Sequence, residues 1–269
     1  MSEKNFRAGI YKSHKAHFDH VYRLHRIAEE AMLSFRHHVR GPYEDALSFI
    51  FPRAYKSFDS IRRLCEVASC EDAAVILRSL LNLLVVTRWI SMEPSGRSRK
   101  YLHWFWIQMY RDAQTFKDTI SPKSMAIIED RYKRVKSQFE SEDKKGKRRQ
   151  AKTWYEPEAL NIRDLFVQVG LETQYEQGYR PLSGIEHSDA TAFFAMVKAM
   201  ERSGTELRLN VQSDLFVPHY LRNAFQYFGD IFEICNRTIP LTDDQKLKSI
   251  IAEGRKVYKA DMEARGIPP

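Results

Sequence analysis

The chain has 269 residues, of which 43% are hydrophobic and 29% charged, a balance typical of globular proteins rather than of disordered chains. Its 11 glycines and 10 prolines are few for this length, which disfavours an all-β sandwich with many tight turns. The formal net charge of +8 favours attraction to RNA or to an acidic protein partner, although many proteins that bind neither carry a similar excess. The three cysteines leave one unpaired in any disulfide scheme, and the N-terminus has no apolar signal core, so we expect a cytoplasmic protein.

Hydrophobic residues that recur every three or four positions predict an all-α protein, because this spacing places them on one face of a helix. The predicted helices cover residues 13–39, 44–68, 73–91, 99–119, 122–140, 154–170, 173–182, 190–202, 218–236 and 242–263. We interpret them as one irregular bundle of about nine helices that forms a single domain, residues 1–269.

The helix predicted over residues 73–91 is apolar on nearly all sides, so we expect it at the centre of the core. Its apolar stretch is too short to cross a bilayer, and no membrane association is predicted. Arg78 and Asn82 interrupt this stretch and lie four residues apart, on one face of the helix. A buried charge needs a partner, so Arg78 either forms a structural lock with another helix or belongs to a functional site.

Two segments interrupt the helical pattern. Residues 141–152 form a charged linker or mobile loop, and an alternation of apolar and polar residues predicts a short strand or hairpin within residues 204–216. The charged loop holds six basic residues: Lys144, Lys145, Lys147, Arg148, Arg149 and Lys152. Trp154 and Tyr155 follow directly, and a basic run beside aromatic rings suits single-stranded RNA. The alternative is a solvated loop without a ligand.

The segment from Tyr175 to His187 holds the polar residues of most chemical interest. Arg180 and His187 are seven residues apart, so an unbroken helix would place them on the same face, although Pro181 interrupts the segment. A guanidinium can hold a phosphodiester and an imidazole can move a proton, so we take these two residues as a candidate catalytic pair. The alternative is that Arg180 pairs with a surface carboxylate and His187 caps a turn.

No metal or other cofactor is predicted. No carboxylate or cysteine pattern completes a metal site around the histidines, which we interpret as surface residues: His14, His17, His20, His25, His37 and His38. The chain has no Walker loop and no GxGxxG, HExxH or GxSxG motif, which excludes the commonest nucleotide-binding, metalloprotease and hydrolase classes. An aromatic stripe is typical of a core or of a seam between helices: Trp104, Trp106, Met109 and Phe116.

The run Leu77-Arg78-Ser79-Leu80-Leu81-Asn82 resembles the central-helix signature of a group of uncharacterised, mostly bacterial proteins catalogued as a domain of unknown function. In that signature Glu follows Arg-Ser-Leu-Leu, where this chain has Asn82, so Arg78 must find its countercharge elsewhere. A second block resembles the family's aromatic-rich helix that leads to Ser and then His: Trp154, Ile162, Arg163, Gly170, Tyr175, Tyr179, Ser183 and His187. The resemblance covers roughly residues 55–200 and implies an all-helical fold without an assigned activity.

The chain is also distantly similar to the HEPN ribonucleases, small helical proteins of toxin–antitoxin and phage-defence systems. Their mark is an Arg followed, after four to six residues, by a His, and six residues separate Arg180 from His187. This resemblance implies a metal-independent endoribonuclease in which Arg180 holds the scissile phosphate and His187 acts as general acid or base. Two protomers usually complete such a site, so it also implies a homodimer. Pro181 departs from the family, which has a polar residue directly after the Arg.

Two functional hypotheses follow. The preferred one is a helical protein of bacterial defence or toxin type that binds a protein or nucleic-acid partner without catalysis, with Arg78, Ser183 and His187 as a buried polar lock. The alternative is a HEPN-like endoribonuclease that uses Arg180 and His187. In that case Ser183 and Tyr179 support the catalytic pair, and the basic residues of the loop over 144–152 hold RNA.

Overall fold

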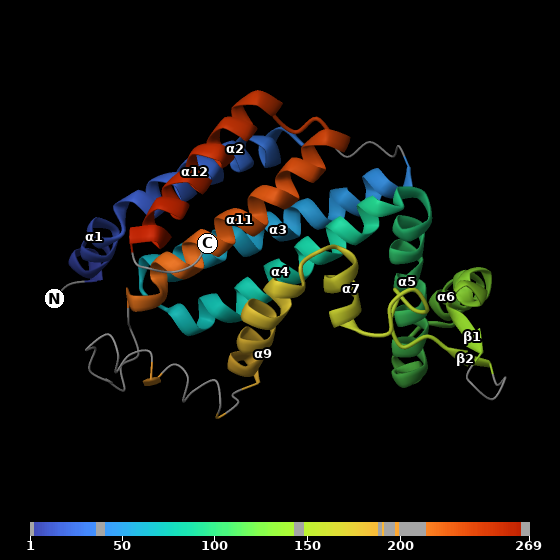
Figure 1. The fold of residues 1–269 in the computed structure, drawn as a ribbon. Coiled ribbons are helices and arrows are strands. Elements are labelled where there is room, and N and C mark those ends of the chain that lie inside the picture. The colour runs from blue at the N-terminus through green and yellow to red at the C-terminus, as the bar shows by residue number, and fades with distance from the viewer. Residues whose placement is uncertain are drawn as a thin grey trace. The chain divides into compact units, whose positions relative to one another are not determined.

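The computed structural model describes residues 3–35, 41–142, 148–187, 190, 197, 198 and 214–264. Helices dominate these residues, which confirms the all-α prediction (Figure 1). The chain divides into two compact units. Unit 1 comprises Met1–His38, Leu47–Arg88 and Leu171–Pro269, and unit 2 comprises Val39–Ala46 and Trp89–Gly170. Compact units are not independently folding domains, so the single-domain prediction stays a prediction.

Unit 1 is built mainly from long helices. These are α1 (Glu3–Ser13), α2 (Lys15–Ser34), α3 (Pro42–Glu66), α4 (Cys70–Met92), α11 (Val217–Thr238) and α12 (Asp244–Ala264), of which α3 begins and α4 ends in unit 2. Helices α2, α11 and α12 pack against one another, and α3 runs beside α11 (Figure 1). The α3–α11 seam is aromatic, with the rings of Phe58 and Phe228 stacked at 4.6 Å. Helix α12 approaches α11 so closely that a Cβ at Gly254 would clash with the Phe225 ring.

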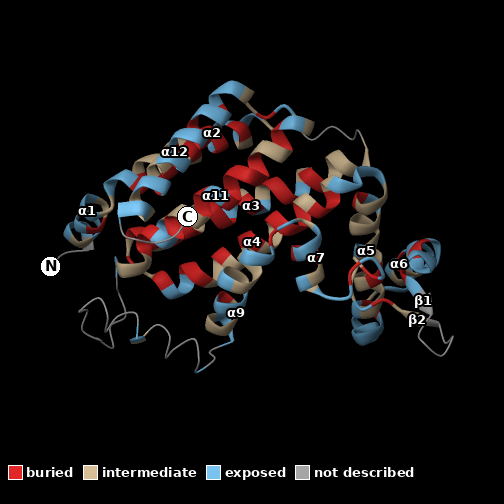
Figure 2. Cartoon of the chain, viewed as in Figure 1, coloured by how far each residue is buried: buried red, intermediate tan, exposed pale blue. Residues whose placement is uncertain are grey.

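Buried residues concentrate along α3, α4 and α11 (Figure 2). Helix α4 buries Leu77, Leu80, Leu81 and Leu84, as expected of a core helix. Contrary to the sequence expectation, α4 is long and apolar enough to cross a membrane, but most of that stretch is buried inside the protein. The burial agrees with a core helix, and the cytoplasmic location stays a prediction.

Unit 2 contains α5 (Pro94–Thr115), α6 (Pro122–Val135) and α7 (Ile162–Gln168), with 3-10 turns at Lys117–Thr119 and Lys136–Phe139. Helices α5 and α6 pack together around a core of Ile107, Val135, Phe139 and Ala151, which Trp104 and Trp106 cover. The predicted aromatic stripe is therefore correct for these two tryptophans. It is wrong for Phe116, whose side chain is exposed at the end of α5.

Several helix ends differ from the predicted ranges. Pro94 lies in the first turn of α5, where its missing N–H leaves no hydrogen bond unmade. Helix α3 continues through Pro52. Of the helix predicted over residues 154–170, only α7 forms, capped by the Asn161 side chain, and the part that contains Pro157 is not helical. The predicted start of α6 is confirmed, because Ser121 caps that helix.

The predicted charged loop over residues 141–152 contains two strands that the sequence analysis missed. Strands β1 (Glu140–Glu142) and β2 (Arg148–Gln150) pair antiparallel, with Ser141 opposite Arg149. The hairpin predicted over residues 204–216 lies outside the described residues up to 213. Residues Asp214–Phe216 form a 3-10 turn, η4, that leads into α11.

Candidate functional site

Arg78, the charge predicted to need a partner, finds it in the segment that follows Tyr175. Its Nη2 donates to the Tyr179 hydroxyl at 2.9 Å, and its guanidinium lies 4.6 Å from the centre of the Tyr179 ring. Its Nη1 forms an ion pair with Glu186. Because Arg78 and Glu186 are both partly covered, this pair joins α4 to the later segment as a lock between helices. Glu186 was not among the predicted site residues, although the segment from Tyr175 to His187 holds only two carboxylates.

The lock is positioned by an uninterrupted helical run over residues 172–186. It consists of α8 (Glu172–Gln174), a π-helical turn η3 (Tyr175–Tyr179) and α9 (Arg180–Glu186), so Pro181 and Gly184 do not break it. The π turn packs against the long helices, because a Cβ at Gly178 would lie 3.5 Å from the Leu81 side chain. A π turn changes which residues share a face, so spacing for an ideal α-helix does not apply here.

Arg180 and His187 are not brought together in the part of the chain that the structure describes. Arg180 pairs with Glu176 at 2.6 Å, and its side chain is 65% exposed. His187 ends α9, its backbone N–H donates to the Ser183 carbonyl at 3.1 Å, and its side chain is 71% exposed. The placement matches the alternative reading, in which Arg180 pairs with a surface carboxylate and His187 caps a turn. The Nε2 atom of His187 lies 3.9 Å from the Glu186 carboxylate, but the His187 side chain is not buried, and the catalytic assignment stays a prediction.

Asn82 shares a helix face with Arg78 but does not form a hydrogen bond with it. The Oδ1 atom of Asn82 and the Nε atom of Arg78 are both buried, and neither finds a hydrogen-bond partner among the described protein residues. Of the predicted polar cluster of Arg78, Asn82 and Tyr179, the structure therefore joins Arg78 to Tyr179.

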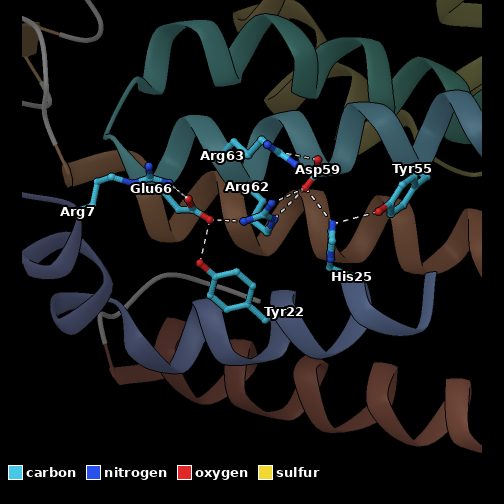
Figure 3. Close-up of polar contacts among 8 residues, drawn as sticks. All are labelled: Arg7, Tyr22, His25, Tyr55, Asp59, Arg62, Arg63 and Glu66. Atoms are coloured by element: carbon cyan, nitrogen blue, oxygen red, sulfur yellow. Dashed lines mark hydrogen bonds and ion pairs between the residues drawn. The ribbon is translucent and has the colours of Figure 1, made fainter. Parts of the chain in front are cut away.

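A second polar network, which the sequence analysis missed, links α1, α2 and α3 (Figure 3). Arg62 is its centre: it donates to Asp59 through Nε at 3.0 Å and pairs with Glu66 one turn later. Glu66 also pairs with Arg7 of α1 and accepts from the Tyr22 hydroxyl of α2 at 2.8 Å. The signal for it lay in the helix predicted over residues 44–68, where acidic and basic side chains alternate three and four positions apart.

His25 extends this network, contrary to its prediction as a surface histidine. Its Nε2 lies 2.9 Å from Asp59 Oδ1 and 3.2 Å from the Tyr55 hydroxyl. Burial and then the nearby Arg62 lower the pKa of His25, while Asp59 opposes the change. Burial alone would raise the pKa of Asp59, but its hydrogen bonds from Arg62 and Arg63 bring it below the ordinary value. Each charge in the network has an opposite charge beside it, so the network is a lock between helices.

His17 also departs from the surface prediction. It is buried, its ring lies 5.2 Å from the Tyr258 ring, and its Nε2 is 3.4 Å from Asp261. Among the described residues, no group of three or more His, Cys, Asp and Glu side chains is placed to hold a metal ion.

The predicted nucleic-acid-binding residues lie in unit 2. Lys144, Lys145 and Lys147 are outside the described residues, as is the side chain of Arg148. Arg149 pairs with the buried carboxylate of Glu156 at 2.9 Å, and Lys152 is exposed. More basic residues stand directly before the predicted loop, on α6 and in the turn after it: Arg131, Lys133, Arg134 and Lys136.

These residues and the predicted loop form a basic segment, residues 131–152. It holds ten Lys and Arg against three Asp and Glu, whereas the rest of the chain holds 33 against 32. Two contacts place β2 and the residue after it beside α6 and the following turn: Gln150 donates to the Tyr132 hydroxyl at 3.5 Å, and the Ala151 N–H donates to the Phe139 carbonyl at 2.7 Å. The excess positive charge of the sequence is therefore concentrated in this one segment.

Comparison with known proteins gives one match. No curated protein and no solved structure matches this sequence. A family model matches residues 44–204, a range that includes Arg78, Asn82 and the segment from Tyr175 to His187. The match covers more than half of the chain, and the protein belongs to DUF5677, a family of unknown function.

Proposed function

We propose that this protein is a non-catalytic helical module that binds nucleic acid through the basic segment, residues 131–152. The observation that carries the proposal is the charge distribution: ten basic and three acidic residues in this segment, and near balance elsewhere. Each nucleic-acid phosphate that is neutralised releases condensed counterions, so a concentrated basic segment supplies affinity without reading a base sequence. A similar excess of positive charge spread over the whole surface would supply far less affinity.

Exposed side chains of α6 support the proposal. Lys133 and Arg134 are 71% and 65% exposed, and each has only an acidic neighbour one turn earlier, Glu129 and Asp130. Ion pairs of this kind on a helix surface contribute little free energy, so a phosphate can replace the carboxylate at small cost. Arg149 differs, because Glu156 beneath it is buried, and we assign Arg149 a structural role rather than a binding role.

The test is an anisotropy titration of a labelled RNA of about 20 nucleotides at roughly 50 and 200 mM KCl. The wild-type protein is expected to bind, and its affinity is expected to fall steeply with salt. The double variant Lys133→Glu/Arg134→Glu is expected to lose about tenfold or more in affinity. Absence of binding at the lower salt concentration contradicts the proposal.

A matched control changes net charge equally on a different helix. Lys248 and Lys259 lie on α12 and are also exposed beside an acidic residue one turn away, Asp244 and Glu263. The variant Lys248→Glu/Lys259→Glu is expected to bind within about twofold of wild type. Equal losses in both variants would mean that net charge, and not the basic segment, drives binding. Competition by polyglutamate as strong as that by RNA would instead favour an acidic protein as partner.

The same RNA, incubated in EDTA, tests the endoribonuclease alternative. Intact RNA is expected, because Arg180 is paired with Glu176. Cleavage by wild type that is lost in His187→Ala would restore the catalytic hypothesis. Mostly bacterial occurrence is predicted from the resemblance to the family of unknown function, and a role in defence or as a toxin is predicted under both functional hypotheses. Both remain predictions, as does the likeness to HEPN ribonucleases. Neighbouring defence or antitoxin genes would support that role.

A further inference from the structure

Helix α5 carries three consecutive aromatic residues, Trp104, Phe105 and Trp106. Successive side chains of a helix point about 100° apart, so a run of three cannot all face one core. Trp104 packs edge-on against Phe139 at 5.1 Å, and Trp106 covers the same core. Phe105 turns outward and is 54% exposed. A large ring stands on the surface of unit 2 at a position where a polar side chain would serve solubility better.

The exposed Phe105 ring contacts Trp106, which also lies near a positive charge. Its centre is 5.1 Å from that of the Trp106 ring, at an interplanar angle of 74°. The guanidinium of Arg131, from the basic segment, lies 5.7 Å from the same Trp106 ring. Trp106 thus lies next to both the exposed aromatic ring of Phe105 and the cation of Arg131.

We infer that Phe105 is a stacking platform for a base of a single-stranded nucleic acid, whose phosphates contact Arg131 and its basic neighbours. This inference rests on the proposed function and specifies its ligand. Bases within a duplex stack on each other and cannot reach a surface ring, whereas unpaired bases stack on aromatic side chains whatever their sequence. A surface that binds only through charge would not distinguish single-stranded from duplex nucleic acid by stacking.

The chain offers a matched control for Phe105 on the same helix. Phe116, at the C-terminal end of α5, is 61% exposed, and eleven residues of helix separate it from Phe105 by about 16 Å. The two rings are alike in chemistry and exposure. They differ in that Phe105 lies against Trp106, which Arg131 also approaches, so only Phe105 should contribute to binding.

The experiment compares an oligouridine of about 12 nucleotides with a blunt RNA duplex of the same length, both labelled, at low salt. Wild type is expected to bind the single strand more tightly. Phe105→Ala and Phe105→Leu are expected to weaken single-strand binding about tenfold and to leave duplex binding unchanged, since Leu keeps the apolar surface but not the flat ring. Phe105→Trp is expected to retain binding, with its fluorescence quenched by the single strand. Phe116→Ala is expected to behave as wild type.

The outcomes separate this inference from the proposed function. If wild type binds neither RNA, both fail. If it binds both RNAs equally and Phe105→Leu is unchanged, the stacking site is wrong and the charge-based function stands. An equal loss in Phe105→Ala and Phe116→Ala would also overturn the stacking site, because it would indicate a general apolar effect. Circular dichroism of each variant verifies that α5 is intact.

Discussion

The charge network of unit 1 and the basic segment of unit 2 contain similar charged residues but differ in burial and in the balance of positive and negative charge. In unit 1, Arg62 lies between Asp59 and Glu66, largely covered, and every charge has an opposite charge at contact distance. In unit 2, the basic segment has more than three cations for each anion, and Lys133 and Arg134 extend into solvent. Covered and paired charges position helices, whereas exposed charges in excess remain available to a polyanion. Under the proposed function, burial and local charge balance, rather than residue type, separate the two roles.

The largest expected effect comes from removing the centre of the unit 1 network. Arg62→Ala should lower the free energy of unfolding by about 3 kcal/mol, because Asp59 and Glu66 would keep a covered charge without its main partner. Urea denaturation measures it. Arg63→Ala is the control: Arg63 also pairs with Asp59 but is mostly exposed, so its loss should be below about 1 kcal/mol. Similar losses for both arginines would contradict the distinction between covered and exposed charges.

Arg149 is expected to have a structural role although it belongs to the basic segment, because its partner Glu156 is buried. Arg149→Ala should cost about 2 kcal/mol, since it leaves the Glu156 carboxylate buried and unpaired. Lys152→Ala, three residues later and exposed, should change stability by less than about 0.5 kcal/mol. The measurement is the thermal or urea unfolding of both variants. Equal stability of the two variants would indicate that Arg149 is a binding residue and not a structural one.

The Arg78–Glu186 lock should contribute a smaller coupling free energy. A double-mutant cycle with Arg78→Met and Glu186→Gln is expected to give about 1–2 kcal/mol, because both side chains are only partly covered. The cycle on the exposed pair Arg180 and Glu176 is the reference and should give below about 0.5 kcal/mol. If the reference pair couples as strongly as the lock, the assignment of Arg78 is wrong.

The smallest effect concerns pH. Because burial and Arg62 lower the pKa of His25 in the folded protein, the unfolded chain takes up this proton first as the pH falls. Stability from His25 is therefore complete above its ordinary pKa of 6.5 and is lost as the pH falls from there through the folded value. His25→Gln should flatten the stability profile in this window. Asp59, whose pKa is lowered from 3.8, loses its contribution only in more acidic solution. An unchanged profile below neutral pH would contradict this account.

Much of the fold could be predicted from periodicity and composition. Helix α4 stands out by its apolar content, and Ser121 marks the start of α6 by its capping chemistry. The errors occur where a local signal has two readings. A proline can end a helix or begin one, and Pro94 begins α5. The short strands β1 and β2 escaped notice because three-residue strands of charged residues carry no apolar alternation.

The site was predicted less well, because its residues meet across long sequence separations. The sequence by itself determined that the protein is all-α, that Arg78 requires a partner within an apolar helix, and that positive charge is concentrated near residue 140. Only the tertiary structure decided that Arg78 pairs with Glu186 and Tyr179, and that Arg180 pairs instead with Glu176. The reason is physical: hydrophobic spacing records the burial of a single helix, whereas an ion pair depends on which helices pack together and on the π turn that rotates one face against another.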